Sequence, residues 1–264
     1  MLDSFMLRDI DPLFFTVARI TTYDDPNTNE VWNFGTGFFY LNPNNQLFLI
    51  TNKHVIRDEG KKYKIQGKEK RYIPKGVWLS LHADPKDLRV NRVYNIPLYK
   101  GAKPQWIEPE PFADVVAIPL KRQDFEEQGL ILKTFSDFNL LPKEYRLHIG
   151  EDILVMGYPL GVYYDDVNNL PVVRNGIVAS AYPVSYKGQP YFLIDAKLHK
   201  GTSGSPVMTK FKRDWRKVEG GSIMGDFQFF LLGINSSTWQ LPEGEEPLGL
   251  NAVVFASIVR EITR

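Results

Sequence analysis

The sequence predicts an all-β fold built from many short strands, and three observations support this. The chain has 264 residues, a length that suits one large all-β domain, because such domains often exceed the usual ~150 residues. Hydrophobic residues make up 43% and charged residues 24%, as is usual for a globular protein with a substantial core. The 17 phenylalanines, 13 tyrosines and 18 prolines favour short strands and turns over long helices.

The elements follow in a regular order along the chain. Residues 10–120 are expected to hold six strands, near 13–21, 31–41, 46–52, 77–82, 90–98 and 114–120. Residues 121–148 form a charged connector with a short helical turn. A second set of strands occupies 150–250, and 256–264 is a short amphipathic closing helix with Ile258, Val259 and Ile262 on one face.

The turn Gly201-Thr202-Ser203-Gly204-Ser205-Pro206 is the strongest candidate for chemistry. Glycines on both sides of Ser203 allow a tight, strained turn that exposes the hydroxyl and aims backbone N–H groups at one point. This is the geometry of a nucleophile beside its oxyanion hole, formed here by the N–H groups of Gly201 and Ser203. Such residues are also ordinary turn formers, so the turn needs partners before it indicates catalysis.

A base and an acid are available elsewhere in the sequence. His54 ends the apolar run 47–52, so that a rigid strand can fix its imidazole, whereas His82 and His148 are explained by a strand exit and a charged connector. Asp114 begins the apolar run 114–120, where a carboxylate needs a hydrogen-bonding partner such as an imidazole N–H. The order His, Asp, Ser is one of the known arrangements of a catalytic triad.

These segments resemble the three signature segments of trypsin-like serine proteases, closest to the bacterial high-temperature-requirement (HtrA-like) protease domains. The segments that carry the resemblance are Ile50-Thr51-Asn52-Lys53-His54-Val55-Ile56, Ala113-Asp114-Val115-Val116-Ala117-Ile118 and Gly201-Thr202-Ser203-Gly204-Ser205-Pro206-Val207. Weaker similarities extend from about residue 14 to residue 262. The resemblance implies one peptidase domain, 1–264, with two six-stranded antiparallel β-barrels of the chymotrypsin type, 10–120 and 150–250. The catalytic site would then lie between the barrels.

The implied activity is that of a serine endopeptidase, with His54, Asp114 and Ser203 as the catalytic residues, acting on a protein or peptide substrate. By the same resemblance the substrate pocket is lined by Lys197, His199, Lys200, Asn235, Ser236 and Thr238. Two interpretations of this pocket stay open. Its basic residues can favour an acidic residue at the cleavage position, or they can point to solvent and leave a small or medium apolar pocket.

Two departures from the family pattern bear on regulation. Thr202 stands where digestive and clotting proteases have an aspartate that pairs with a new N-terminus, so we do not expect activation by N-terminal insertion. The chain as given ends at Arg264, where many HtrA-like proteins continue into a PDZ domain, so we expect no control by such a domain. The alternative function is a catalytically silent or latent domain that acts as a protein-binding or effector-regulated module. A regulatory partner stays open, and the sequence does not predict the oligomeric state.

Composition excludes several other classes of function. The formal net charge of +1 gives no general attraction to nucleic acid, and we interpret the basic strip at 57–75 as a solvated hairpin. The sequence has no cysteine, no apparent signal peptide and no apolar run long enough to span a membrane, so we expect a cytoplasmic protein that does not act at a membrane. Motifs for zinc or for nucleotide phosphates are lacking, so we expect no metal and no cofactor.

Overall fold

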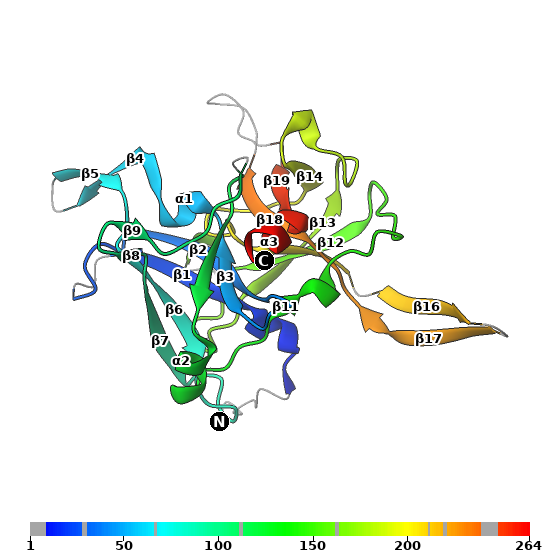
Figure 1. Cartoon of the computed structure of the whole chain (residues 1–264), viewed down its shortest axis with the longest axis horizontal. Coiled ribbons are helices and arrows are strands. Elements are labelled where there is room, and N and C mark those ends of the chain that lie inside the picture. Colours follow the sequence, from blue (N-terminus) through cyan, green and yellow to red (C-terminus); the bar gives the residue numbers. More distant parts are fainter. Residues whose placement is uncertain are drawn as a thin grey trace.

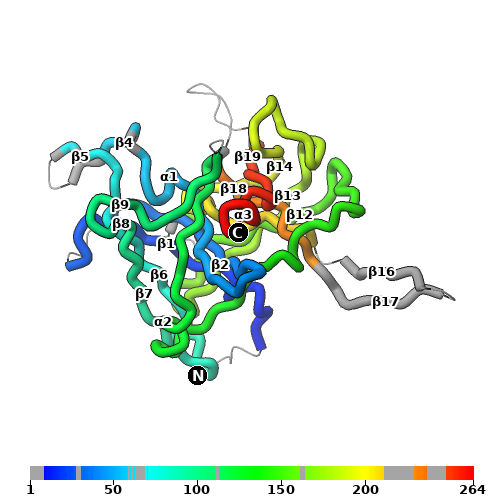
Figure 2. Tube along the Cα trace, in the orientation of Figure 1, coloured from blue at the N-terminus to red at the C-terminus, as the bar shows by residue number. Residues whose placement is uncertain are grey.

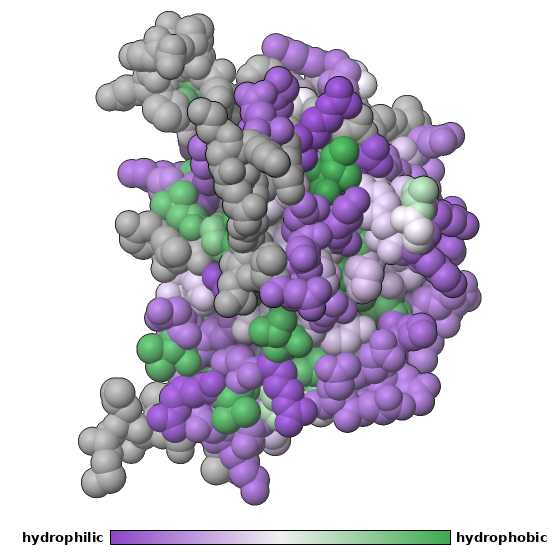
Figure 3. All heavy atoms as spheres, turned by 90° about the vertical axis from the view of Figure 1, so that its left-hand side faces the viewer, coloured by the Kyte–Doolittle hydropathy of each residue, from purple (hydrophilic) through white to green (hydrophobic). Residues whose placement is uncertain are grey.

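The computed structural model describes residues 9–27, 31–65, 68–110, 113–161, 164–210, 212–218, 221–238 and 248–264. Two β-rich bodies lie side by side, and the chain passes from one to the other once (Figure 1). The prediction of an all-β, chymotrypsin-type double barrel is confirmed. Among the described residues, no helix is long and apolar enough to cross a membrane. On the side shown in Figure 3 the described surface is mainly hydrophilic, with separate hydrophobic patches.

The first body is one curled sheet with the strand order β10-β3-β2-β1-β6-β7. Its strands are β1 (Val17–Tyr23), β2 (Asn33–Leu41), β3 (Leu47–Thr51), β6 (Gly76–His82), β7 (Asn91–Pro97) and β10 (Val116–Leu120), with β11 (Phe135–Ser136) added parallel to β2. The six expected strands are thus present. The first differs at its start, because 3-10 helix η2 (Pro12–Thr16), whose first turn is capped by Asp11, occupies the beginning of the predicted 13–21 strand.

This sheet does not close into the complete barrel that we expected. Between its described strands, no ladder joins β7 to β10. The edge strands carry Pro97 and Pro119, which have no N–H to donate to such a ladder. The segment 98–107, with the small hairpin of β8 (Tyr99–Lys100) and β9 (Lys103–Pro104), covers the gap and reaches β10 through a single bridge between Ile107 and Ala117.

The second body is a closed six-stranded barrel with the order β12-β13-β14-β19-β18-β15. Its strands are β12 (Asp152–Gly157), β13 (Val172–Val178), β14 (Tyr191–Asp195), β15 (Pro206–Thr209), β18 (Leu231–Thr238) and β19 (Leu250–Phe255). Short helical segments punctuate the connections: α2 (Arg122–Glu127), which is the helical turn expected in the connector, η3 (Asp137–Asn139), η4 (Pro159–Gly161) and η5 (Tyr186–Gly188).

The closing helix α3 (Ala256–Ile262) lies where the two bodies meet, as Figure 2 shows in red near the centre. Val259 and Ile262 are buried on the face that the sequence predicted, and Ile258 is partly buried. They belong to one apolar cluster that includes Phe38 and Ile50 of the first body and residues of the second. Burial of this shared cluster stabilises the docking of the two bodies, on which any site between them depends.

Two hairpins extend from this core. The hairpin of β4 (Asp58–Ile65) and β5 (Lys68–Tyr72) confirms the interpretation of the basic strip as a hairpin, and its Lys62–Glu69 ion pair is exposed. The hairpin of β16 (Lys212–Val218) and β17 (Gly221–Gln228) projects from the second barrel (Figure 1). The sequence analysis did not anticipate this second hairpin.

Candidate active site

His54 lies on the four-residue helix α1 (Lys53–Ile56), directly after the buried strand β3. The last residue of β3, Thr51, pairs with Val116 at the start of β10, and this pairing brings the segment of Asp114 beside α1. Asn52 holds the Asp114 segment next to α1, because its Nδ2 donates a 2.6 Å hydrogen bond to the carbonyl oxygen of Asp114. Two neighbouring strands therefore deliver the imidazole and the carboxylate to the same edge of the sheet.

The His54 imidazole and the Asp114 carboxylate are in direct contact. His54 Nδ1 lies 2.6 Å from Asp114 Oδ2, and the backbone N–H of His54 donates to Oδ1 at 3.1 Å. Because an ionised carboxylate accepts hydrogen bonds only, this contact places the imidazole proton on Nδ1. Nε2 is then the acceptor nitrogen, which is the state that a general base requires.

The carboxylate of Asp114 is kept ionised by its partners. Burial acts to raise its pKa, but the hydrogen bonds and charge of His54 and the hydroxyl of Ser236 outweigh this and hold the pKa below its ordinary value. Ser236 Oγ donates to Asp114 Oδ2 at 2.6 Å from β18 of the second barrel. The sequence analysis placed Ser236 in the substrate pocket, whereas its hydroxyl contacts the carboxylate.

Ser203 lies on a turn whose backbone only glycine can form. Gly201 and Gly204 have φ values of 90° and 87°. A Cβ on Gly204 would also lie 1.9 Å from the carbonyl oxygen of Thr36, so a larger residue has no room there. The turn is held from both barrels: Thr36 N donates to Ser203 O at 2.9 Å, and Gly204 N donates to Asn235 O at 2.9 Å.

The N–H groups of this turn divide into two sets. Those of Thr202, Gly204 and Ser205 donate to carbonyl oxygens of His199, Asn235 and Thr202, respectively. In the described part of the chain, the N–H groups of Gly201 and Ser203 have no such acceptor.

One hydrogen bond sets the direction of the Gly201 N–H. Leu160 N donates to the carbonyl oxygen of Lys200 at 2.5 Å. The N–H and C=O of a trans peptide point in opposite directions, so the Gly201 N–H points away from Leu160. The arrangement can therefore offer this N–H to an incoming oxyanion.

The Ser203 hydroxyl is not bound to the imidazole in this structure. Ser203 Oγ donates a 3.4 Å hydrogen bond to the carbonyl oxygen of Ser236, and among the described contacts none joins it to His54. Catalytic hydrogen bonds are often long or misaligned in unliganded enzymes. The two halves of the predicted triad thus both contact Ser236.

The remaining predicted pocket residues fall into two groups. Lys197, His199 and Lys200 are exposed on the segment that leads into the turn. Asn235 is buried, and its Nδ2 donates to the carbonyl oxygen of Thr202 at 3.0 Å, so its side chain holds the turn. Thr238 ends β18, and its side chain lies outside the described part of the structure.

Thr36 is a site residue that the sequence analysis did not single out. Its Oγ1 donates to the carbonyl oxygen of Gly201 at 2.9 Å and accepts from Tyr158 N at 3.0 Å. One buried hydroxyl on β2 thereby links the Ser203 turn to the end of β12. The glycines at positions 35 and 37 mark it in the sequence, because a Cβ at either would collide with packed side chains.

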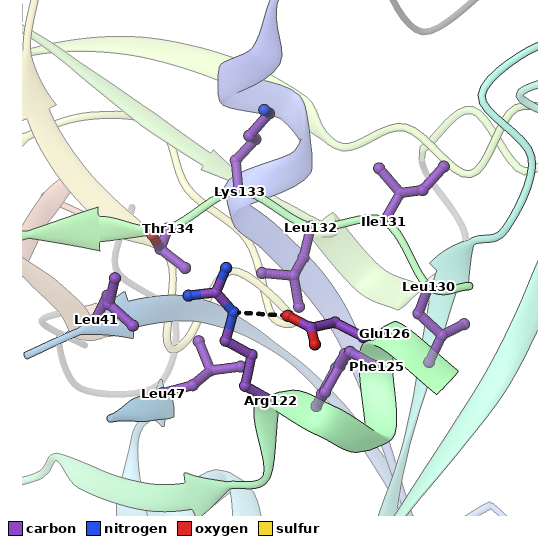
Figure 4. A pocket seen from close by; sticks show the side chains of 10 residues that line it. All are labelled: Leu41, Leu47, Arg122, Phe125, Glu126, Leu130, Ile131, Leu132, Lys133 and Thr134. Carbon is purple, nitrogen blue, oxygen red and sulfur yellow. Dashed lines mark hydrogen bonds and ion pairs between the residues drawn. The ribbon is translucent and has the colours of Figure 1, made fainter. Parts of the chain in front are cut away.

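The described residues contain no group of three or more histidines and carboxylates that could hold a metal ion. An apolar pocket of about 410 Å³ lies between α2 and the segment 130–134 of the first body, with Arg122 and Glu126 paired at 3.0 Å over it (Figure 4). It shares no residue with the His54, Asp114 and Ser203 group.

Comparison with known proteins agrees with this fold. The family model of the trypsin-like peptidase domain matches residues 35–213, more than half of the chain, so the chain belongs to the trypsin-like peptidase family. The solved structure of the serine endoprotease from Yersinia pestis is similar at 14% identity with a TM-score of 0.53, a likeness of fold. The match covers 95% of this chain and 62% of that one, so this chain spans less than two thirds of its structural neighbour. No curated protein matches the sequence.

Proposed function

We propose that the protein is a serine endopeptidase in which Ser203 is the nucleophile, His54 the general base and Asp114 the orienting acid. The observation that carries this proposal is the 2.6 Å contact between His54 Nδ1 and Asp114 Oδ2, next to a glycine-flanked serine turn. Membership of the trypsin-like peptidase family supports it. An imidazole oriented by a buried carboxylate is the activating pair that a serine nucleophile needs.

The reaction begins when the Ser203 hydroxyl turns from the Ser236 carbonyl towards His54 Nε2. The imidazole takes the Oγ proton as Oγ attacks the substrate carbonyl, and Asp114 stabilises the imidazolium that forms. His54 then gives the proton to the leaving amine, which breaks the peptide bond and leaves an acyl-enzyme. Water then attacks this ester. His54 takes a proton from the water and gives it to Ser203 Oγ, which releases the acid product and restores the hydroxyl.

The oxyanion of each tetrahedral intermediate is assigned to the N–H groups of Gly201 and Ser203. Both lack an internal acceptor in the described structure, so they need not break a bond before they bind the oxyanion. One such donor typically contributes about 3 kcal/mol to lowering the barrier.

We also propose that the protein is HtrA-like, that its substrate is a protein or peptide and that it is cytoplasmic; the sequence supports each of these. Thr202 supports a mode of control other than N-terminal insertion, because its Oγ1 donates to His199 O at 2.7 Å and carries no charge.

Hydrolysis of an unstructured protein such as casein tests the proposal. The wild-type protein should cut internal peptide bonds, and Ser203→Ala should lose this activity. Ser205→Ala is the matched control, because Ser205 Oγ is buried in the same turn and has no hydrogen-bond partner among the residues that the structure describes. Equal cleavage by wild type and Ser203→Ala would refute the assignment.

A latent domain is the second candidate, and one observation favours it. Ser203 Oγ is bound to Ser236 O rather than to the imidazole. If the hydroxyl keeps this position, the triad stays incomplete until a change in the turn lets Ser203 Oγ reach His54 Nε2. A latent domain predicts little cleavage by the protein alone and a marked increase with an effector.

A further inference from the structure

A second cavity, of about 370 Å³, borders the turn 201–206 at Thr202. The turn at 159–160, the start of β13 and the segment 197–202 surround it. Its apolar wall includes Leu160, Val172 and Leu198, and its basic side chains are Arg174, Lys197 and His199. His54, Asp114 and Ser203 do not line it.

The chemistry of this cavity favours a carboxylate on an apolar group. Arg174 is half-buried, whereas Lys197 and His199 are exposed at the rim. In the part of the chain that the structure describes, no carboxylate pairs with any of the three. Basic residues that line a cavity beside an apolar wall suit an amphipathic anion, because the charge and the apolar body each find a complementary surface.

The cavity is connected directly to the peptide that sets the oxyanion hole. Leu160 lines the cavity, and its N–H holds the carbonyl oxygen of Lys200. Thr202 also lines it and bonds to His199 O through both its N–H and its Oγ1. Leu160 thus holds the peptide between Lys200 and Gly201 directly, and the two bonds between Thr202 and His199 close the turn that contains this peptide.

Leu160 has an unfavourable backbone conformation at the wall of this cavity. Leu160 has φ 54° and ψ 8°, the left-handed region that a residue with a Cβ rarely adopts. Its side chain is 41% exposed. A ligand in the cavity would bury this side chain and thereby favour the strained turn.

We propose that this cavity is an effector site for a carboxylate carried by a short branched aliphatic group. Its occupancy stabilises the Leu160 turn and so keeps the Gly201 N–H directed at the substrate. A free short-chain acid and a peptide C-terminus that ends in an aliphatic residue share this chemistry. The binding site stands on the geometry alone, whereas its regulatory effect rests on the proposed peptidase function.

Binding is tested first, by calorimetry on the Ser203→Ala protein, which cannot turn over a peptide. The probes are 4-methylpentanoate and acetyl-Gly-Gly-Leu, each compared with its neutral amide. We expect each carboxylate to bind at least tenfold more tightly than its amide. If the peptide binds more tightly than 4-methylpentanoate, the natural ligand is a peptide C-terminus. If the two bind equally, the natural ligand is a small acid. Adding Arg174→Gln should abolish binding. Arg146→Gln should not, because Arg146 is an exposed arginine that does not line this cavity. Binding that ignores the carboxylate or Arg174 overturns the site.

The regulatory effect is tested by the rate at which a fluorophosphonate labels the wild-type protein. Saturating 4-methylpentanoate should raise this rate at least threefold, and its amide should not. Arg174→Gln should keep the basal rate and lose the increase. A decrease would mean that the carboxylate competes in the substrate cleft and would overturn the effect, as would an unchanged rate. If no sample is labelled at all, the peptidase proposal fails and the regulatory effect with it, while the calorimetry still decides the binding site.

Discussion

Ser236 Oγ donates a hydrogen bond of 2.6 Å to Asp114 Oδ2, the same oxygen that lies 2.6 Å from His54 Nδ1. Asp114 precedes β10 of the first body and Ser236 lies on β18 of the second. The carboxylate that orients the imidazole is therefore held from both bodies. The carbonyl of Ser236 also accepts from Ser203 Oγ, so this one residue connects Asp114 with Ser203.

Replacing Ser236 by alanine should weaken both stability and catalysis. The change removes one hydrogen bond to a charged, largely buried carboxylate, a loss of about 1.5–3 kcal/mol, while the backbone carbonyl that contacts Ser203 remains. We expect a lower free energy of unfolding in urea and a kcat/KM reduced about tenfold or more. Unchanged values of both would show that the hydroxyl contributes nothing to the site.

The charge of Asp114 should make stability depend on pH. Its pKa is lowered in the folded protein, because the contacts with His54 and Ser236 outweigh the opposing effect of burial. Its stabilising contribution is therefore complete above the ordinary pKa of about 4 and is lost as the pH falls through the lowered value.

The advantage of wild type over Asp114→Asn in unfolding free energy should accordingly shrink between about pH 5 and pH 2. Urea unfolding across this range measures it. Asp152→Asn is the control, because Asp152 forms an exposed pair with Lys210 and should show a much smaller change. A difference between wild type and Asp114→Asn that is constant with pH would contradict the lowered pKa.

Asp114→Asn should also reduce kcat at neutral pH, on the order of 10⁴-fold, the loss known for this substitution in the triad of a trypsin-like protease. The amide can donate a hydrogen bond to Nδ1 and so stabilise the wrong imidazole tautomer. Steady-state kinetics with a fluorogenic peptide measure the loss. A reduction of less than tenfold would argue that His54 does not depend on this carboxylate.

Thr36→Val should disturb the nucleophile turn without a change of shape at position 36. The Tyr158 N–H and the Gly201 carbonyl, which Thr36 Oγ1 now satisfies, would be left unpaired, at about 1–3 kcal/mol each. We expect a lower kcat with a modest change in KM. Thr263→Val makes the same change at a buried hydroxyl at the C-terminal end of α3, and should reduce stability alone.

Cleavage specificity separates the two interpretations of the substrate pocket. Lys197 and His199 are exposed and line the effector cavity, so we expect a small or medium apolar residue at the cleavage position rather than an acidic one. Mass-spectrometric profiling of a peptide library measures this preference. A clear preference for acidic residues would support the other interpretation, and one for basic residues would contradict both.

Local sequence patterns predicted the six strands of the first body, because most of them bury a continuous or alternating set of apolar side chains. For the second body they predicted only that strands occupy 150–250. The pairing of β3 with β10, which brings His54 to Asp114, is a long-range contact that the local patterns did not predict. The open edge of the first sheet was not predicted, because it depends on Pro97 and Pro119 lying on the two edge strands. Only the three-dimensional order of the strands reveals that position.

The supporting residues of the site were harder to predict than its charged members. Thr36 and Ser236 act through one hydroxyl each, and serine and threonine are common in strands for other reasons. Their roles depend on contacts across the boundary between the two bodies. Thr36 and Gly201 are 165 residues apart in the sequence, and Ser236 and Asp114 are 122 residues apart. No local pattern reports such contacts.

Fluorophosphonate labelling, with the modified residue located by peptide mapping, tests the central claim most directly. We expect one adduct, on Ser203 of the wild-type protein and of Ser205→Ala, and none on Ser203→Ala. Labelling should be much slower in Asp114→Asn, because its imidazole is no longer held in the basic tautomer. An adduct on a different residue, or labelling that persists in Ser203→Ala, would contradict the assignment of Ser203 as the nucleophile.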